Sequence, residues 1–585
     1  MSNSVGLVQH TTYYAPSSGT NFMRGLVPVK VEHSAGRTGT KYFDREWVYL
    51  DTGDNWYKAV GGVTIGNPIV KESREYHAEG STGTSSNYNI TTYAHTFWSS
   101  TSWLIKKVET SEPTVTTGTN GSNAATTTER YTYENGLTGF TRDQGGHFTY
   151  FEYDSLTGQL TRRVDDVDDD DTAAATAATA LGATLPTTGG LRLETSYTYD
   201  RQGRVMSSKM PHARITARHY TKLADNREVQ LSFPLYAVVS SVPTWYGPMS
   251  YRVLNHAGQA ESTMTLTLDG SGNTSTDPAA IIDEAESDAM TAVDTGEATI
   301  AHLATATYDE AGSRMLGSRV YFTLPADLTP TPTTGYDETL FGYDSRGRQT
   351  RVEDPDGTIH RTDFDVLSRV TARWVGTNDS GSPNMTEFER REYDGGNEGN
   401  GHLTKVTLDP NGVWTGSPPP PTTADQRVTE FAYTYRGFNT LVKGPLPPFT
   451  VTAYDNLGRP TASAGYSSAS GLTAASAPSS PTNRVSLDET FYDARGQVWK
   501  TITHKIDYLE GAGDGSDDDS LTTLHWFDAE GRGIKSVGPG GLNKTQYDVV
   551  GRVTHEFTLA STNDSGYGDA DDVSGDLVLE ERQTY

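Results

Sequence analysis

An aromatic residue, a polar turn sequence and an aliphatic residue recur along the chain in that order. The clearest copy runs from Tyr199 to Arg204 (YDRQGR) and is followed by Val205. An Asp with a Gly three residues later is typical of a type I turn, in which the Asp side chain accepts backbone N–H bonds and the Gly adopts a positive φ. Closed as a hairpin with a Gly bulge, this turn places Asp200 opposite Arg204 and Tyr199 opposite Val205. The pattern therefore predicts short antiparallel strands joined by tight turns.

This six-residue pattern is repeated. The copies at Tyr343 and Phe364, and those at Phe527 and Tyr547, lie 21 and 20 residues apart, which indicates an array of small supersecondary units. One cross-strand pair contributes only about 0.2–1 kcal/mol, so stability must come from many hairpins side by side. Strict copies begin at Tyr199, Tyr343, Tyr454, Phe527 and Tyr547, and looser copies begin at Tyr308, at Phe364 with Ser368 in place of Gly, and at Tyr492 with Gln497 in place of Arg. The pairs Tyr547–Val553, Phe364–Val370 and Tyr492–Val498 fit the aromatic and aliphatic scheme, whereas Tyr343–Gln349 and Phe527–Gly533 do not.

Three further copies depart from the pattern. An extra residue separates Asp154 from Gly158, and Tyr435 is followed by Arg436 where an Asp is expected. Asp394 opens into the Gly-rich stretch 395–401. We expect these turns to be larger or differently capped.

The repeated residues resemble the YD repeat of the RHS and teneurin-like superfamily, whose units read Tyr-Asp-x-x-Gly-Arg followed by an apolar residue. The phrase at 351–358 (RVEDPDGT) resembles the intervening half of that unit. Clear repeats cover 131–585, and 1–130 is a β-rich region compatible with degenerate copies. The resemblance implies an all-β array of antiparallel hairpins that forms part of a hollow spiral shell, similar to the YD shells of Tc toxins. Such shells enclose a toxic polypeptide in bacteria or are displayed at the cell surface.

The composition agrees with a shell more than with one compact core. Hydrophobic residues make up 34% of the chain, against roughly 45% or more in an average globular chain on a slightly broader count. A hollow shell accommodates this because both of its faces meet solvent or cargo. Aromatic residues nevertheless reach 10%, with 32 Tyr against 17 Phe, and this argues against disorder.

Charge and residue usage exclude several classes of function. The net charge of −28 repels phosphate backbones, so we expect no nucleic-acid partner. No apolar run reaches the length of about 18 residues that a membrane span needs, and 1–14 shows no signal-peptide pattern. The absence of Cys excludes disulfides, thiolate metal sites and Cys nucleophiles. A secreted or cell-surface location is implied by the resemblance alone.

Insertions interrupt the array near 165–188, 268–304, 461–487 and 508–520. The acidic and Ala/Thr-rich stretch Asp165–Thr188 and the Ser/Ala/Pro-rich stretch Thr461–Pro481 are predicted to be solvated loops that do not pack. Asp277 as N-cap and Pro278 at the first helical position predict the one inserted helix, and Ile281, Ile282 and Met290 give it a partial apolar face.

No residue is predicted to be catalytic, to bind a cofactor or to bind a metal. The acidic runs 165–171 and 514–519 carry the carboxylates that Ca²⁺ prefers, but neither has EF-hand spacing, which favours solvated loops. Asn563–Gly566 is interpreted as a turn. The chain has no HExxH pair and no Gly-x-Ser-x-Gly elbow.

Three hypotheses of function remain: a non-catalytic structural shell, a carbohydrate-binding surface adhesin and a glycan-active enzyme. The first implies an encapsulated C-terminal polypeptide that this chain does not contain, and the second a glycan partner. Carboxylate pairs could serve a glycosidase, and Tyr and Trp rings could stack on sugars. Turn chemistry and cross-strand packing are the favoured interpretations of both residue types.

A longer duplication bears on how the array is organised. The segments 376–381 (GTNDSG) and 389–394 (ERREYD) recur as 561–566 (STNDSG) and 581–585 (ERQTY). The chain stops where the next Asp is expected, and it contains no RHS-associated core. We therefore expect a fragment cut inside a repeat, with an unpaired strand edge near 583–585.

Overall fold

The computed structural model describes most of the chain. The described residues are 7–13, 28–35, 40–49, 57–60, 63–66, 69–78, 88–99, 104–211, 214–223, 225–237, 243–245, 248–268, 298–324, 334–380, 384–396, 400–409, 426–505, 520–564 and 566–584. The helix predicted at Asp277 and the acidic run 514–519 lie outside these residues.

The elements are short, and the strands are 3 to 11 residues long. The chain begins with β1 (Leu7–Tyr13), β2 (Pro28–Ala35), β3 (Tyr42–Tyr49), β4 (Tyr57–Val60), β5 (Val63–Gly66), β6 (Val70–Tyr76), β7 (Tyr88–Phe97), β8 (Ile105–Ser111), the 3-10 helix η2 (Thr117–Thr119), β9 (Thr127–Thr132), β10 (Thr138–Arg142), β11 (Phe148–Tyr153), β12 (Leu160–Asp165) and α1 (Thr172–Leu181). It continues with β13 (Leu193–Tyr199), β14 (Val205–Lys209), β15 (Arg214–Lys222), β16 (Glu228–Ala237), β17 (Pro243–Trp245), β18 (Met249–Leu254), β19 (Ala260–Leu268), β20 (Ala298–Tyr308), β21 (Met315–Tyr321), β22 (Tyr336–Tyr343), β23 (Gln349–Glu353), β24 (Ile359–Phe364), β25 (Val370–Gly376), β26 (Thr386–Tyr393), η3 (Asp394–Gly396) and β27 (Leu403–Leu408). It ends with β28 (Arg427–Tyr433), β29 (Asn439–Lys443), β30 (Phe449–Tyr454), β31 (Pro460–Tyr466), β32 (Arg484–Tyr492), β33 (Val498–His504), β34 (Leu521–Phe527), β35 (Gly533–Gly538), β36 (Gly541–Tyr547), β37 (Val553–Ser561), η4 (Tyr567–Asp569) and β38 (Leu577–Gln583).

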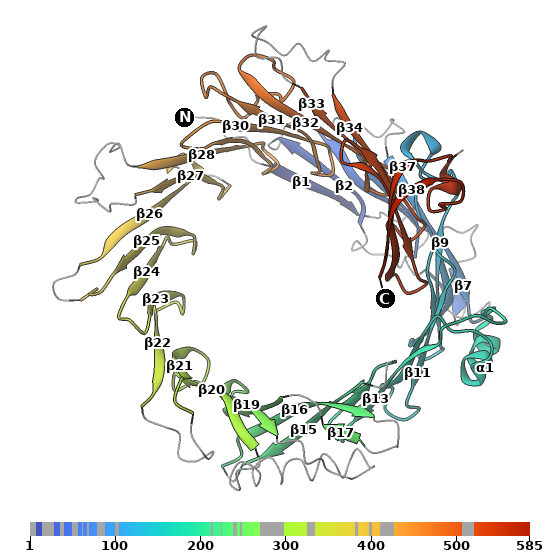
Figure 1. The fold of residues 1–585 in the computed structure, drawn as a ribbon, viewed down its shortest axis with the longest axis horizontal. Coiled ribbons are helices and arrows are strands. Elements are labelled where there is room, and N and C mark those ends of the chain that lie inside the picture. Colours follow the sequence, from blue (N-terminus) through green and yellow to red (C-terminus); the bar gives the residue numbers. More distant parts are fainter. Residues whose placement is uncertain are drawn as a thin grey trace.

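Among the described residues, 36 strands form one antiparallel sheet, and β4 and β5 form a separate hairpin. Strands that follow one another in the chain pair with one another, from β1 with β2 to β37 with β38, with two exceptions: β3 pairs with β6, and β16 pairs with both β17 and β18. The sheet does not close: it curls into a ring-shaped spiral in which the first strands, β1 to β9, and the last strands, β30 to β38, occupy the same sector (Figure 1). The predicted all-β array of hairpins in an unclosed spiral is confirmed.

The repeated turn has the predicted geometry. Tyr199 lies opposite Val205, and the N–H of Asp200 donates to the carbonyl of Arg204 at 3.0 Å. One Asp200 oxygen, Oδ1, accepts the Arg204 N–H at 2.9 Å, and the other, Oδ2, accepts Nε of the same Arg at 2.7 Å. Gly203 closes the bulge with a φ of 84°. The pairs Tyr343–Gln349, Phe364–Val370, Tyr492–Val498, Phe527–Gly533 and Tyr547–Val553 share this register, including the two whose side chains do not fit the aromatic and aliphatic scheme.

The aromatic residue and the Arg of each unit also connect neighbouring hairpins, which the sequence did not predict. The Tyr343 hydroxyl donates to the carbonyl of Met315 at 2.8 Å, and Met315 directly follows the Arg of the preceding unit. The guanidinium of Arg459 lies 4.3 Å from the centre of the Tyr492 ring in the next unit. Equivalent hydroxyl bonds join Tyr199 to Leu160, Tyr308 to Ala260, Tyr393 to Val370, Tyr433 to Leu403, Tyr454 to Asn439, Tyr492 to Pro460 and Tyr547 to Gly533. A Phe cannot make this bond, and this is a physical reason for the excess of Tyr over Phe.

The irregular copies need one correction. The hairpin of β28 and β29 uses Tyr433 and Thr434, not Tyr435, at the Tyr and Asp positions: the Thr434 Oγ1 accepts the N–H of Phe438 at 3.2 Å. The other two copies have larger turns, as predicted. The N–H of Gly158 donates to the carbonyl of Asp154, four residues away, and the N–H of His402 donates to Oδ1 of Asp394, eight residues away.

The segment Asp165–Thr188 packs against the sheet, so the prediction of a solvated loop is wrong. Asp171 caps α1 by accepting the N–H of Ala174 at 3.0 Å. Ala174, Ala178 and Leu181 are all buried, and they contact a cluster that includes Phe140 and Tyr150. These three residues follow the i, i+4, i+7 spacing of an amphipathic helix, which the Ala/Thr bias of the segment hides.

The segment Thr461–Pro481 also packs, contrary to prediction. Its first part belongs to β31, and its loop folds back over the side chain of Tyr466, which is 1% exposed. The Tyr466 hydroxyl donates to the carbonyls of Ala477 and Ser480, each at 3.0 Å. Leu472 packs against the cluster around Val451 and Leu487.

Burial among the described residues is divided into separate clusters. One lies between β15 and β22, one lies beneath α1, and one lies between β29 and β32. This division explains how a chain with 34% hydrophobic residues folds without one large core. Within the described part of the chain, no helix is long and apolar enough to cross a membrane.

Candidate functional site

Two successive turns of the spiral touch along a line that we call the seam. Hydrogen bonds there join residues that are 369 to 413 positions apart in the sequence. On the first turn the seam comprises Asp44, Phe43, Tyr76, His77, Pro113, Asn120, Thr126, Asp143 and His147, and on the second turn it comprises Arg436, Asn456, Arg495, His525 and Glu530. The seam is therefore a region where side chains of one turn of the spiral bond directly to the other turn.

Asn456 makes the most contacts across the seam. It occupies the position after Asp455 in a repeated turn and is 1% exposed. Its Nδ2 donates to the carbonyls of Phe43 at 2.9 Å and Tyr76 at 2.7 Å, and its backbone N–H donates to the carbonyl of His77 at 3.2 Å. These bonds add a polar anchor to two strands of the first turn.

Arg436 forms the ionic contact of the seam. Its Nη2 lies 3.0 Å from Oδ1 of Asp44, and the same carboxylate oxygen lies 2.6 Å from Nδ1 of His33. Nη1 of Arg436 also donates to the carbonyl of Asn456 at 2.8 Å. With Tyr433 and Thr434 at the Tyr and Asp positions, Arg436 occupies the variable position before Gly437, and from there it reaches across to the first turn of the spiral.

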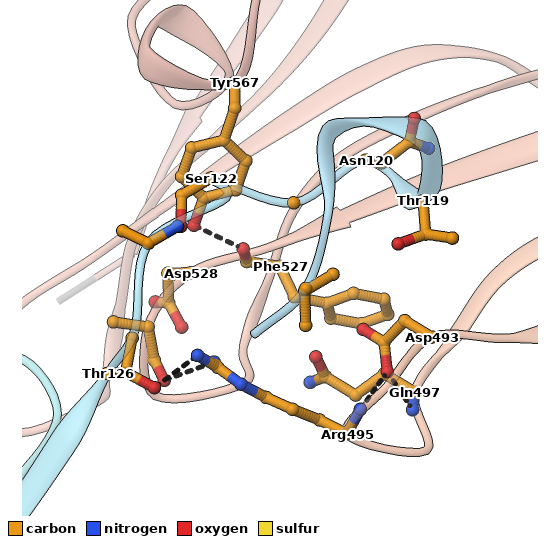
Figure 2. Close-up of a pocket in the computed structure, with 14 residues that line it drawn as sticks. Thr119, Asn120, Ser122, Thr126, Asp493, Arg495, Gln497, Phe527, Asp528 and Tyr567 are labelled. Carbon is orange, nitrogen blue, oxygen red and sulfur yellow. Dashed lines mark hydrogen bonds between the residues drawn. The ribbon is translucent and has the colours of Figure 1, made fainter. Parts of the chain in front are cut away.

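A cavity of about 270 Å³ lies at the seam between η2 and the turns that precede β33 and β35 (Figure 2). Arg495 extends along it, donates to the carbonyl of Pro113 at 3.3 Å and also bonds Oγ1 of Thr126. The Tyr567 hydroxyl donates to the carbonyl of Phe527 at 2.7 Å. The remaining lining residues are Val115, Thr119, Asn120, Gly121, Ser122, Ala124, Asp493, Gln497, Asp528 and Ala529.

Asp493 in this cavity differs from the other turn carboxylates. Gln497 stands where the repeated pattern has Arg, and its side chain donates to the carbonyl of Gly531 at 3.0 Å. Burial raises the pKa of Asp493 above its ordinary value, although N–H bonds from Gln497 and Arg495 oppose the shift. In the looser copy of the turn at Asp309, the side-chain bond from Arg314 and backbone N–H bonds lower the pKa of the Asp to about 2.

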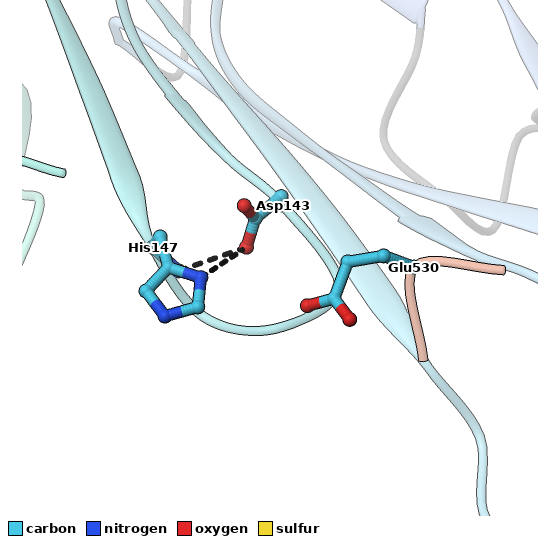
Figure 3. Close-up of side chains that lie close together, drawn as sticks. All are labelled: Asp143, His147 and Glu530. Carbon is cyan, nitrogen blue, oxygen red and sulfur yellow. Dashed lines mark hydrogen bonds and ion pairs between the residues drawn. The ribbon is translucent and has the colours of Figure 1, made fainter. Parts of the chain in front are cut away.

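Three side chains with metal-binding atoms converge further along the seam (Figure 3). Asp143 and His147 flank the turn between β10 and β11, and Glu530 lies in the turn between β34 and β35. Their ligand atoms all lie within 4.8 Å of one another. The sequence did not predict this cluster, because its members are 387 residues apart and only the curl of the sheet brings them together.

Two carboxylates of the acidic run 165–171, which the sequence analysis considered for Ca²⁺, are engaged within the fold. Oδ2 of Asp166 accepts the N–H of Leu191 at 2.7 Å, and Oδ2 of Asp168 accepts the N–H of Gly190 at 3.0 Å. In the Asn563–Gly566 segment, Asp564 binds Nζ of Lys544 at 2.7 Å, and Lys544 is fully buried. The Lys544 ammonium also donates to the carbonyls of Asp569 and Asp572 and to Oδ2 of Asp576, so the segment from 564 to 576 surrounds it with oxygens.

The comparisons with known proteins are limited. No protein-family model matches the sequence, and no curated protein matches it. Among solved structures, the chain is similar to the crystal structure of TcdB2-TccC3-Cdc42, with 11% identity and a TM-score of 0.37 over 92% of this chain and 28% of that chain. It is also similar to the Photorhabdus luminescens Tc holotoxin pore, with 12% identity and a TM-score of 0.29 over 92% of this chain and 29% of that chain. The chain thus spans less than a third of each of these solved chains.

Proposed function

We propose that the chain is a segment of a non-catalytic structural shell of the RHS/YD-repeat type, which encloses a polypeptide that is not part of this chain. The observation that carries the proposal is the seam: one continuous sheet of hairpins curls until its second turn bonds to its first. The centre of the ring holds no strand or helix of the described residues (Figure 1). A wall of this form suits enclosure.

The links between hairpins support a wall. In eight hairpins the Tyr hydroxyl bonds the preceding unit, and Arg side chains such as Arg459 cover an aromatic ring of the next unit, so many neighbouring hairpins repeat the same contacts. A hydrogen bond contributes about 0.5–1.5 kcal/mol net, and the sum over many units gives a long sheet its stability.

The same contacts argue against the two alternative functions. Hydrogen bonds from Arg204 outweigh partial desolvation and lower the pKa of Asp200, so this carboxyl stays ionised and is a poor general acid. Tyr343 and Tyr492 use their hydroxyls and ring faces within the wall. An adhesin would need aromatic faces open to sugars.

The location and the partner are parts of this proposal. A shell of this type would act outside the cell or at its surface, and its partner would be the enclosed polypeptide. Glycan binding and glycan cleavage are not part of it.

Electron microscopy of the full chain tests the shell. We expect ring-shaped particles with an open centre, and compact or rod-shaped particles would contradict the proposal. An unstructured passenger fused to the C-terminus tests enclosure: a protease should cleave it more slowly than the same passenger fused to an unrelated β-protein. Equal cleavage rates would exclude enclosure. Binding on a glycan array, or release of reducing sugars, would support the alternatives.

A further inference from the structure

The cluster of Asp143, His147 and Glu530 has the features of a metal site between turns of the spiral (Figure 3). One imidazole and two carboxylates offer ligand atoms within 4.8 Å of one another. All three side chains are partly buried. Nδ1 of His147 lies 3.4 Å from Oδ1 of Asp143, is shielded from solvent and has no hydrogen-bond partner among the described residues.

The first and second turns of the spiral lie close together at this cluster. Gly145 lies under the carboxylate of Glu530: a Cβ at position 145 would stand 1.8 Å from Oε1 of Glu530 and 2.9 Å from the ring of His147. A larger residue at position 145 would therefore displace the Glu530 carboxylate or the His147 ring. The first turn thus presents a cradle of backbone and imidazole in which the carboxylate of the second turn rests.

The cradle also concentrates negative charge. Asp143 offers a carboxylate oxygen within 4.8 Å of the Glu530 carboxylate, and Asp528 carries another carboxylate two residues before Glu530. Arg532 lies 2.9 Å from Oε2 of Glu530 and also pairs with Asp528. Since Arg532 pairs with two carboxylates and Asp143 adds a third beside Glu530, these four side chains carry more negative than positive charge, which a divalent cation would neutralise.

We propose that Asp143, His147 and Glu530 bind a divalent transition-metal ion, with Zn²⁺ as the reference, and that the ion clips the second turn of the spiral to the first. An imidazole nitrogen with carboxylate oxygens suits Zn²⁺, Co²⁺ or Ni²⁺, whereas Ca²⁺ and Mg²⁺ prefer oxygen alone. Ligand atoms about 2.0–2.2 Å from a tetrahedral Zn²⁺ lie about 3.3 Å apart, so the three side chains need to close by small movements. Water would complete the coordination. The inference does not depend on enclosure, because a clip between turns needs no cargo.

Calorimetric titration of the full, metal-free chain with ZnCl₂ tests the site. We expect one ion per chain and a higher melting temperature in its presence. Glu530→Gln keeps the shape of the side chain and should weaken Zn²⁺ binding on the order of tenfold or more. His147→Gln should do the same. Co²⁺ should give d–d absorption that is lost in both variants.

His360→Gln provides the matched control. His360 lies 3.1 Å from Asp354 in a hairpin that faces solvent, so it has the same imidazole and carboxylate pair without a third ligand from another turn. This variant should bind Zn²⁺ as the unmodified chain does. Equal Zn²⁺ affinity in Glu530→Gln and the unmodified chain would overturn the proposal, as would Ca²⁺ binding as tightly as Zn²⁺. Circular dichroism confirms that each variant is folded, and an unchanged spectrum with lost binding supports the site.

Discussion

The turn between β22 and β23 and the turn between β34 and β35 share one sequence pattern and one geometry. In both, Nε of the last Arg binds the first Asp, at 2.7 Å for Arg348 and 2.5 Å for Arg532. In the first turn, the variable residue Arg346 donates to the carbonyl of Val366 in the next hairpin at 2.8 Å. In the hairpin turn between β34 and β35, the variable residue Glu530 instead lies beside Asp143 and His147, which belong to the first turn of the spiral. In both places the invariant positions form the hairpin, whereas the residues at the variable positions contact whichever part of the molecule lies next to that hairpin.

This contrast extends to the rest of the molecule. We call β13–β27 the single-layer arc and the strands from β28 onward the seam arc. In the single-layer arc the residue after the turn Asp is exposed, as in Val366, which is 78% exposed. In the seam arc the same position holds Asn456, which is 1% exposed and bonds two carbonyls of the first turn. The contacts between turns of the spiral are thus made by residues at the variable positions of the repeat.

Removing the Asn456 anchor should have the largest effect. Asn456→Ala leaves the buried carbonyls of Phe43 and Tyr76 without a donor, at a cost of about 3 kcal/mol. Hydrogen exchange followed by mass spectrometry should show the strand at 70–76 exchanging about a hundredfold faster. Val366→Ala, at the same turn position in the single-layer arc, should leave exchange unchanged. Similar exchange in both variants would show that the seam does not depend on this residue.

The hairpins could be predicted from the sequence because their signals are local. Asp, Gly and Arg lie within five residues, so turn chemistry alone fixes the register of Tyr199 with Val205. The low-complexity segments were harder, since the buried face of α1 consists mainly of Ala, whose side chain resembles that of a solvated Ala/Thr loop. Tertiary packing decides between the two, and that packing is not visible in composition.

Strain at the turn Gly should be the next effect in size, and it should be equal in both arcs. Gly347 has a φ of 81° and Gly551 a φ of 84°, and a Cβ at either position would meet only an Arg Nη1, at 4.0 Å and 3.8 Å. Replacing either residue with Val should therefore cost roughly 1–3 kcal/mol through the backbone alone. Thermal melts measure the loss.

The controls for this prediction are Ser345→Thr and Val549→Thr, at variable positions of the same two turns. Both should cost less than the Gly replacements. If Val lowers the melting temperature at Gly551 but not at Gly347, the two arcs differ in the geometry of the hairpin turn itself. That result would contradict the conclusion that they differ only at variable positions.

Loss of a Tyr hydroxyl should have a smaller effect, again equal in the two arcs. Tyr343→Phe removes the bond to Met315, and Tyr547→Phe removes the bond to Gly533. Each should lower the free energy of unfolding by about 1 kcal/mol. Phe364→Tyr, which adds a hydroxyl at an equivalent position, should not destabilise. Urea denaturation of the variants side by side measures these changes. An unchanged free energy of unfolding in both Phe variants would show that the Tyr hydroxyls do not stabilise the contact between neighbouring hairpins.

The seam could not be predicted from the sequence. Its partners are up to 413 residues apart, and which pairs meet depends on how far the sheet curls per hairpin. Arg436, which bonds Asp44 across the seam, occupies a variable position once Tyr433 and Thr434 are aligned with the repeat, so it did not signal the contact. Glu530 also occupies a variable position of the repeat, and no neighbouring residue in the sequence distinguishes it from other variable residues.

The smallest predicted effect contrasts two carboxylates at the same turn position. Burial and like charges raise the pKa of Glu530 in the seam arc, whereas hydrogen bonds from Thr358 lower the pKa of Asp356 in the single-layer arc. A raised pKa means that folding disfavours the ionised carboxylate, and this destabilisation decreases as pH falls through the folded-state pKa. A lowered pKa means that folding favours the ionised carboxylate, and this stabilisation is lost as pH falls through the folded-state pKa. In EDTA at pH 7, Glu530→Gln should therefore stabilise the chain by less than about 1 kcal/mol, and Asp356→Asn should destabilise it slightly. The Glu530 difference should vanish below the ordinary carboxyl pKa of about 4, where Glu530 is protonated in either state. The Asp356 difference should shrink below that pH and vanish only below the lowered pKa of the folded state. Melting temperatures across this pH range measure both signs, and a destabilising Glu530→Gln at pH 7 without metal would contradict the excess negative charge assigned to the seam.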